Sequence, residues 1–456
     1  MNSCLKLLIL SVLLLAMYAC STPEEPSVSV VEPIAFKSHS DSVPKHHGKL
    51  FEINCAYPKE LPHSVFKLSE AFQSPLNKDN AAAYIQELKQ HVTPALEKFI
   101  LDNANWNAKK EGWFHEPWIG DTRDPILGCY NGNNNQKGTF KNVNENQLGY
   151  VLVLYDSLAA FTLGEIFGTD GMVPLTKDRK VDLEKEKGQF KEGAVILKLA
   201  FSNVNQDKWS DMEGAREFQI YNNNPSDTVY KYHTVSLFQI DMIVKDSKNS
   251  PTTGWMFSTL VYDKSVKSKN ILDKFVPLGG MWGNDPEVNT AVSEVYYDQN
   301  PLLQETWINN SAPYYSRETL GWGGRLSGPN DGAVALNGIV NGKTYERLQM
   351  TSCMSCHLPA QQKFASFLLP AKDITKNIFY SNNDPEWKRY FRDLKGTESF
   401  DPGEYSFDYD MAIAFKSMKA YLQYLDSTAT QNKQRYMTTD KQDNYKLFEE
   451  YRKIKE

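Results

Sequence analysis

The stretch TGWMFSTLVYD, residues 253–263, alternates between two sets of side chains. One set is aromatic or β-branched and consists of Trp255, Phe257, Thr259 and Val261. Such alternation, bounded by Gly and Asp, is typical of a β-strand. Two runs of similar composition precede it, GAVILKLAFSNV at 193–204 and HTVSLFQIDMIVKD at 233–246. We therefore predict a mostly antiparallel β-sheet over roughly residues 185–285.

Two segments before this sheet have their own patterns. Residues 80–103, NAAAYIQELKQHVTPALEKFILDN, have helical periodicity, with Pro94 as a possible break. Residues 146–168, NQLGYVLVLYDSLAAFTLGEIFG, fit either a buried helix or a strand followed by a helix. Periodicity alone does not separate these two structures, so both stay open.

The composition places the chain among globular proteins. It has 456 residues, of which 41% are apolar and 23% are charged, and its formal net charge is −6. Such a length predicts two or three domains. The negative charge argues against a nucleic-acid partner and against electrostatic adhesion to anionic membranes. We find no phosphate-binding loop, nucleotide fingerprint or repeat in the sequence.

The first twenty residues, MNSCLKLLILSVLLLAMYAC, combine Lys6 with an apolar run from Leu7 to Met17. This run has the length of a signal peptide and is short for a permanent membrane span. It resembles a bacterial lipoprotein signal, which implies cleavage after residue 19 and acylation of Cys20. An ordinary cleaved signal and a short uncleaved anchor are the alternatives. The polar residues 20–48 then form a lipidated tether, and we expect an anchored protein in a Gram-negative cell envelope, facing the periplasm or the cell surface.

The segment QMTSCMSCHLPAQ, residues 349–361, contains a Cys-x-x-Cys-His motif. A redox dithiol usually lies in a strand-helix turn of a parallel α/β unit, and a zinc site needs a second ligand pair at matching spacing. Neither context is visible nearby. The motif is the attachment signature of c-type haem, in which two thiols three residues apart face one porphyrin edge. We therefore predict one covalent haem c at Cys353 and Cys356, with His357 as proximal iron ligand.

The sequence around the motif resembles the first and last helices of a class I cytochrome c domain. Residues 341–362 are expected to form one helix through the motif, and residues 407–426 have an amphipathic helical pattern. The blocks GWFHEPW, TGWMFSTLVYD and MWGNDP, followed by a late haem motif, resemble a family of large exported bacterial cytochrome c proteins. The resemblance implies an α+β fold: a mixed helical and antiparallel β region at 49–310, an all-α cytochrome c-like domain at 311–428 and a polar tail at 429–456.

The second axial ligand of the iron has several candidates. No histidine follows His357, and Met411 lies at a distance typical of the ligand methionine in cytochrome c, so we predict Met411 as the sixth ligand. In the alternative, Met411 and Met418 only fill the apolar side of the last helix. His115, from the front half of the chain, is a further candidate, and an open iron site is the remaining possibility.

Other polar residues have structural and functional interpretations. The segment GWFHEPWIGDTRDP, residues 112–125, fits a pocket with His115, Glu116, Asp121, Arg123 and Asp124, but a packed loop is the favoured interpretation. The remaining expectations are a structural role for His233, solvation of His46 and His47, turn capping by Asn284 and Asp285, and a possible disulfide between Cys55 and Cys129.

The predicted function is electron transfer at the cell envelope by a one-haem lipoprotein. Its partner would be a redox protein or a small-molecule electron donor. A simple carrier needs only about 100 residues, so the long front region argues for docking or substrate binding. A haem-dependent oxidoreductase and a haem-based sensor or binding lipoprotein are the alternatives.

Overall fold

The computed structural model describes twelve parts of the chain. They are residues 34–38, 46, 48–63, 66–67, 75–117, 123–178, 180–222, 230–288, 302–362, 371–373, 376–381 and 384–417. All belong to the compact unit Ile34–Glu456, which is distinct from a unit formed by Met1–Pro33. Among the described residues, no helix combines the length and apolar character needed to cross a membrane.

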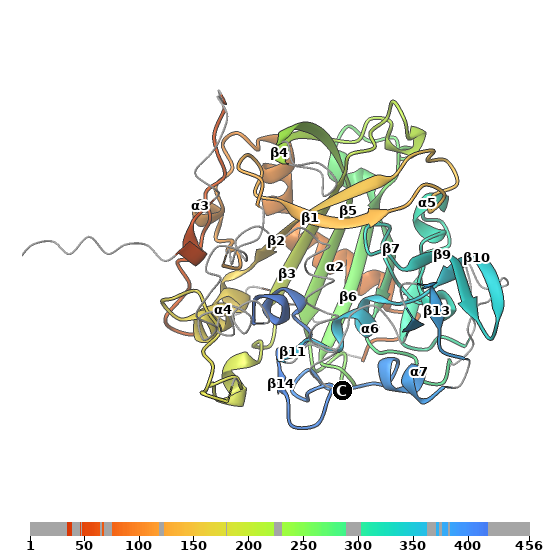
Figure 1. The fold of residues 1–456 in the computed structure, drawn as a ribbon. Coiled ribbons are helices and arrows are strands. Elements are labelled where there is room, and N and C mark those ends of the chain that lie inside the picture. Colours follow the sequence, from red (N-terminus) through yellow and green to blue (C-terminus); the bar gives the residue numbers. More distant parts are fainter. Residues whose placement is uncertain are drawn as a thin grey trace, which may run out of the picture. The chain divides into compact units, whose positions relative to one another are not determined.

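A large antiparallel sheet forms the centre of this unit (Figure 1). Its strands lie in the order β1-β2-β3-β5-β6-β7-β8, and β4 pairs with β5. Their bounds are β1 Tyr130–Asn135, β2 Gln147–Tyr155, β3 Val195–Ser202, β4 Glu217–Asn222, β5 Lys231–Lys245, β6 Trp255–Tyr262, β7 Phe275–Met281 and β8 Thr306–Ile308. The antiparallel sheet predicted over residues 185–285 is thereby confirmed.

Helix α2, Ala81–Leu101, covers one face of this sheet (Figure 1). It runs through Pro94 without a break. Gly280 of β7 allows the close approach, because a Cβ there would lie 2.4 Å from Met256 Cε and 2.9 Å from Ile85 Cδ1. Burial of the apolar side of α2 against the strands provides the main stabilisation of this layer.

The segment 146–168 is a strand followed by a helix, the second of its two predicted forms. After β2, helix α4 spans Ser157–Phe167 and begins at the N-cap Asp156, whose side chain accepts from Ala159 N at 2.7 Å. The apolar run is buried in both elements. This explains why hydrophobicity without a clear period could not distinguish them.

Smaller sheets and short helices follow the central sheet. The second sheet has the order β10-β9-β13-β12, and β11 pairs with β14. The strands are β9 Val334–Val340, β10 Lys343–Gln349, β11 Gln361–Gln362, β12 Ala371–Asp373, β13 Ile378–Phe379 and β14 Tyr405–Ser406. The helices are α3 Ala108–Glu111, α5 Tyr314–Arg317, α6 Cys353–His357, α7 Pro385–Tyr390 and residues 411–417. The 3₁₀ turns are η1 Ile34–Phe36, η2 Lys185–Gly188, η3 Ser210–Met212, η4 Ile271–Lys274 and η5 Trp322–Gly324.

The predicted fold class is wrong, because the described part of residues 311–428 does not form an all-α domain. This part contains strands β9–β14 and only short helices. The helix expected over residues 341–362 is also wrong. Asn341 and Gly342 have φ values of 53° and 76° and join β9 to β10 in a hairpin. Positive φ at two consecutive turn residues favours a hairpin, whereas an α-helix needs negative φ throughout.

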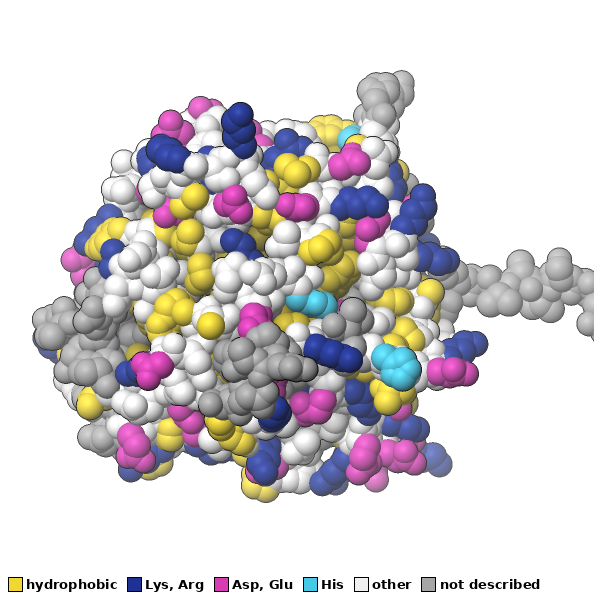
Figure 2. Space-filling view, turned by 180° about the vertical axis from the view of Figure 1, so that it is seen from behind, with side chains coloured by type: hydrophobic (Ala, Val, Ile, Leu, Met, Phe, Trp, Pro, Cys, Tyr) yellow, Lys and Arg dark blue, Asp and Glu magenta, His cyan; other side chains and the backbone are white. Residues whose placement is uncertain are grey.

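Figure 2 shows the described residues from behind. Lysine and arginine side chains are interspersed there with aspartate and glutamate, and single hydrophobic side chains lie between them. Interspersed charges of both signs give this face a mixed electrostatic field.

Candidate functional site

Helix α6 is a single turn that carries the whole Cys-x-x-Cys-His motif. It starts at a reciprocal cap: Ser352 Oγ accepts from Ser355 N at 3.2 Å, and Ser355 Oγ accepts from Ser352 N at 3.0 Å. Such a capping box stabilises a helix start. Because residues i and i+3 share a helix face, Cys353 and Cys356 lie on the same side of α6.

His357 is oriented by a single backbone group. Its Nδ1 lies 2.7 Å from the carbonyl oxygen of Tyr409, and because a carbonyl only accepts, Nδ1 donates. The neutral ring therefore has its lone pair on Nε2, which forms no hydrogen bond with the described residues. Burial lowers the pKa of His357 to about 4, so the ring is neutral at pH 7. A neutral imidazole with Nδ1 bonded to a carbonyl is the usual form of a metal-ligating histidine.

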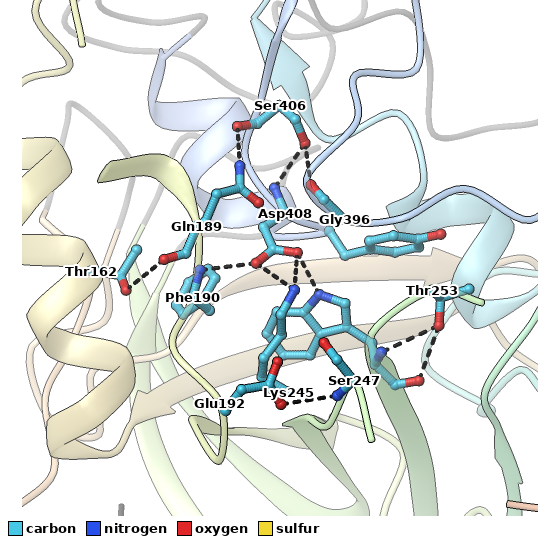
Figure 3. A network of polar contacts seen from close by, with 12 residues as sticks. Thr162, Gln189, Phe190, Glu192, Lys245, Ser247, Thr253, Gly396, Ser406 and Asp408 are labelled. Atoms are coloured by element: carbon cyan, nitrogen blue, oxygen red, sulfur yellow. Dashed lines mark hydrogen bonds and ion pairs between the residues drawn. The ribbon is translucent and has the colours of Figure 1, made fainter. Parts of the chain in front are cut away.

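The loop that provides this carbonyl is fixed by a buried carboxylate (Figure 3). Asp408 Oδ1 accepts from Lys245 Nζ and from Trp255 Nε1, each at 2.7 Å. Its Oδ2 accepts from Phe190 N at 2.9 Å. Asp408 and Tyr409 both have positive φ, 48° and 68°, which is unfavourable for residues with a side chain. The contacts of Asp408 therefore hold a strained turn that aims the Tyr409 carbonyl at His357.

The two thiols of the motif are half-buried and protonated. Burial raises the pKa of Cys353 well above its usual range and that of Cys356 to about 12. A reactive redox dithiol or a zinc ligand needs an accessible thiolate, which a lowered pKa would favour. Among the described residues, no group of three His, Cys, Asp or Glu side chains is gathered to hold a metal ion. The raised pKa values of the two thiols do not favour a reactive dithiol.

A polar cluster on the central sheet lies beside α6. Lys198 Nζ contacts Asp241 Oδ2 at 2.8 Å and Asp331 Oδ1 at 2.6 Å. Burial lowers the pKa of Lys198, but the two carboxylates outweigh this effect and raise it. Lys198 also contributes to the electrostatic environment of Cys356 and His357. The lysine is therefore charged and close to the motif.

This cluster was not identified in the sequence analysis. Its members, Lys198 on β3 and Asp241 on β5, face each other in register on one side of the sheet. Both interrupt otherwise apolar runs, and a charged residue inside a buried strand is the signal that could have revealed them. Phe257 of β6 lies on the same side and meets the His357 ring edge-to-face at 4.9 Å between centroids. Helix α6 thus lies over the face opposite α2.

The structure places Met411 two residues after Tyr409, at the start of the helix 411–417. Its side chain is 9% exposed and belongs to the hydrophobic core. The carbonyl oxygen of Tyr409 contacts His357 Nδ1, the imidazole nitrogen on the other side of the ring from Nε2. Burial in the core is what the packing interpretation of Met411 expects. Its ligation stays a prediction. Met418, the second methionine of this pattern, lies outside the described residues.

The segment around His115 is buried. Asn54 N donates to His115 Nδ1 at 2.9 Å, and the Phe51 ring packs against the imidazole. Asp124 accepts from the backbone of Leu127 and Gly128 and so holds a turn. These contacts agree with the favoured packed-loop interpretation, and His115 is not brought to His357 by any described contact. Asp121 lies outside the described residues.

The remaining predicted residues have local roles or no described structure. His233 Nε2 lies 3.2 Å from Asn222 O on the neighbouring strand. Asp285 accepts from Glu305 N at 2.8 Å and from the Thr306 hydroxyl at 2.7 Å, and Asn284 Nδ2 donates to Arg392 O at 2.9 Å. His46 is half-buried and stacks with Tyr232 at 6.4 Å. Cys20 and His47 lie outside the described residues.

The predicted cysteine pair lies in the same region as His115. Cys129 is a buried thiol, and Cys55 Sγ donates to His115 O at 3.5 Å. A disulfide between them stays a prediction.

Comparisons of this chain with protein-family models, with curated proteins and with solved structures found no match. The geometry of α6 and of the residues around it therefore decides which function we propose.

Proposed function

We propose that this chain binds one haem c covalently through Cys353 and Cys356 and uses it to transfer electrons at the cell envelope. The observation that carries the proposal is the arrangement on α6. Both thiols and His357 lie on one helical turn, and Tyr409 O fixes the imidazole with Nε2 as its only basic nitrogen. The donor set fits a c-type haem, which would supply an iron that changes reversibly between two oxidation states.

The chain's own residues prepare this site. Tyr409 orients His357 and increases the basicity of Nε2, and Asp408 holds Tyr409 in place. Phe257 excludes water from one side of the ring. Lys198 carries a positive charge near the motif, and Asp241 and Asp331 balance it.

Haem staining on a denaturing gel tests the proposal. The mature chain, expressed with a haem-attachment system, should stain, and the double variant Cys353→Ala/Cys356→Ala should not. The double variant Cys55→Ala/Cys129→Ala removes the same number of thiols elsewhere and should still stain. A stain that survives the first double variant, or its absence from the unsubstituted chain, would contradict the proposal.

The sixth iron ligand has its own test. If Met411 is the ligand, Met411→Ala should remove the weak near-infrared band of His/Met ligation and lower the reduction potential. If Met411 only packs, the spectrum and the potential should stay unchanged while the free energy of unfolding falls by about 2–5 kcal/mol, the usual cost of removing a buried methionine side chain.

A haem-dependent oxidoreductase is the second candidate, and one observation favours it. Lys198, Asp241 and Asp331 form a charged cluster beside the motif, where a simple carrier needs only packing. Steady-state reduction by candidate small-molecule donors separates the two functions. In an enzyme, the rate of haem reduction should saturate with the donor concentration, and Asp241→Asn should lower this rate. In a carrier, neither the saturation nor the effect of Asp241→Asn is expected.

A further inference from the structure

A second group of polar residues is buried among residues 113–117, residues 123–126 and the helix 411–417. Arg123 is 3% exposed, Glu116 is 2% exposed and Lys416 is 4% exposed. Arg123 Nη2 donates to Glu116 O at 3.1 Å and to the Tyr130 hydroxyl. Its Nε and Nη1 are buried and have no hydrogen-bond partner among the described residues, and the same holds for Glu116 Oε2. A buried arginine with two unpaired nitrogens is costly, because each donor has lost its water.

The unpaired groups are mainly donors. His115 Nδ1 accepts from Asn54 N, so Nε2 carries the proton, and this N–H is also buried without a partner in the described part of the chain. Together with Arg123 Nε and Nη1, it gives three donor nitrogens against one unpaired acceptor oxygen, that of Glu116. A site with an excess of donors favours a ligand that offers several acceptor oxygens.

The ionisable groups of this site are two basic side chains and two carboxyl groups, and burial lowers the pKa of Lys416 to about 7. Lys416 Nζ lies 4.6 Å from the Tyr130 ring centroid, so two basic side chains surround this tyrosine. Glu116 is the opposing carboxylate, and its Oε1 is 3.9 Å from Arg123 Nη2, beyond hydrogen-bond distance. Asp410 adds a carboxyl that accepts from the Tyr155 hydroxyl at 3.1 Å. Burial raises the pKa of Asp410 to about 7, so it is partly protonated at neutral pH.

Two aromatic rings restrict the shape of the ligand. The Arg123 Cζ lies 5.3 Å from the Phe51 ring centroid and 4.7 Å from that of Tyr130. A planar carboxylate matches the edge of a guanidinium through parallel N–H···O bonds, whereas a tetrahedral anion matches it less well.

We propose that Arg123, with Lys416 and His115, forms an internal binding site for a carboxylate group. This chemistry has two sources. One is a propionate of the haem, and this source rests on the proposed function. The other is a separate small carboxylic acid, and this source does not rest on the proposed function.

Propionate itself is the probe, and propionamide is its neutral isostere. In the haem-free Cys353→Ala/Cys356→Ala chain, calorimetry should detect binding of propionate and not of propionamide. Arg123→Gln should weaken this binding at least about tenfold, since hydrogen bonds to charged groups contribute about 1.5–3 kcal/mol each. Lys416→Met keeps the core filled and should weaken it too, which covers the case in which Arg123→Gln does not fold. The control Arg389→Gln removes a half-exposed arginine paired with Glu386 and Asp401, and should leave binding unchanged.

The haem-loaded chain distinguishes the two sources. If a haem propionate occupies the site, the loaded chain should not bind added propionate, and Arg123→Gln should shift the reduction potential to more negative values while haem staining persists. If a separate acid occupies it, the loaded chain should bind propionate and its potential should not depend on Arg123. Absence of propionate binding in the haem-free chain together with an unchanged potential in the loaded variants would overturn the proposal. If no haem is attached at all, the proposed function fails, but the titration of the unsubstituted chain still tests the carboxylate site.

Discussion

Single side chains hold the candidate haem site in place, and Asp408 is the most constrained of them. It is fully buried, pairs with the buried Lys245 and receives the Trp255 indole N–H. Gly396 passes so close that a Cβ on it would overlap Asp408 Oδ1 at 1.7 Å. The turn that carries Tyr409 therefore depends on contacts from three distant parts of the chain.

The first prediction concerns this ion pair. Asp408→Asn leaves the Lys245 ammonium buried without a counter-charge and should lower the free energy of unfolding by about 3–5 kcal/mol. Urea unfolding measures the change. Lys376→Met, which removes an exposed ion pair with Asp373, should cost less than about 1 kcal/mol. Similar losses in the two variants would contradict a structural role for the Asp408 carboxylate.

The second prediction is a pH dependence caused by Asp156, the N-cap of α4. Burial raises the pKa of Asp156 to about 7, above the 3.8 of the unfolded chain. Between these values the folded chain binds the extra proton, so the stability from Asp156 is complete below about pH 4 and is lost as the pH rises to about 7.

Asp156→Asn keeps a capping side chain but removes this titration. The fall in unfolding free energy from pH 4 to 7 should then be smaller than in the unsubstituted chain, by at most about 4 kcal/mol. Urea unfolding at a series of pH values measures it. Parallel pH profiles of the two chains would show that Asp156 is not the titrating group.

At the scale of secondary structure, the central sheet was predictable and the C-terminal elements were not. Strands β3, β5 and β6 are rich in apolar and β-branched residues, with few charged residues such as Lys198 and Asp241 inside them, so their composition identifies them. The strands β11 and β13 have two residues each and leave no periodic signal. They form because β14 and β9 lie beside them, and such long-range pairing is not encoded locally.

The predicted haem motif was found from the spacing of its residues, whereas the residues that surround it were found only in the structure. Cys353, Cys356 and His357 are adjacent in sequence, but Tyr409, Phe257 and Lys198 reach them only through the fold. The helix expected before the motif failed because Asn341-Gly342 was interpreted as the start of a helix when it is a hairpin turn. Local residues predict the attachment chemistry, and tertiary contacts decide how the imidazole is held.

The third prediction separates the hairpin from the helix. Gly342 has a φ of 76° and no atom within 4 Å of a Cβ position, so only the backbone opposes a substitution. Gly342→Ala should destabilise the protein by about 1–2 kcal/mol, the cost of the left-handed region for a residue with a side chain. In a helix the same change would stabilise by about 1 kcal/mol. Thermal or urea unfolding of the variant measures the sign, and a stabilised variant would exclude the hairpin.

At the scale of the whole molecule, we predict that lipidated Cys20 anchors the chain and that the unit Ile34–Glu456 carries the haem. Met1–Pro33 form their own unit, and the lipidation of Cys20 stays a prediction. Cys20→Ser should release the protein from the membrane fraction, because acyl chains would then be its apolar anchor. Membrane fractionation at high salt measures the release. A variant that is cleaved but stays in the membrane fraction would show that another feature anchors the chain.

We propose above all that α6 carries a covalent haem c. The most direct measurement is the intact mass of the mature protein, purified after expression with a haem-attachment system that loads a control cytochrome. We predict a mass increase of one haem per chain, lost in Cys353→Ala/Cys356→Ala and kept in Cys55→Ala/Cys129→Ala. An unmodified mass for the unsubstituted chain, or a haem mass retained without the two α6 thiols, would contradict the claim.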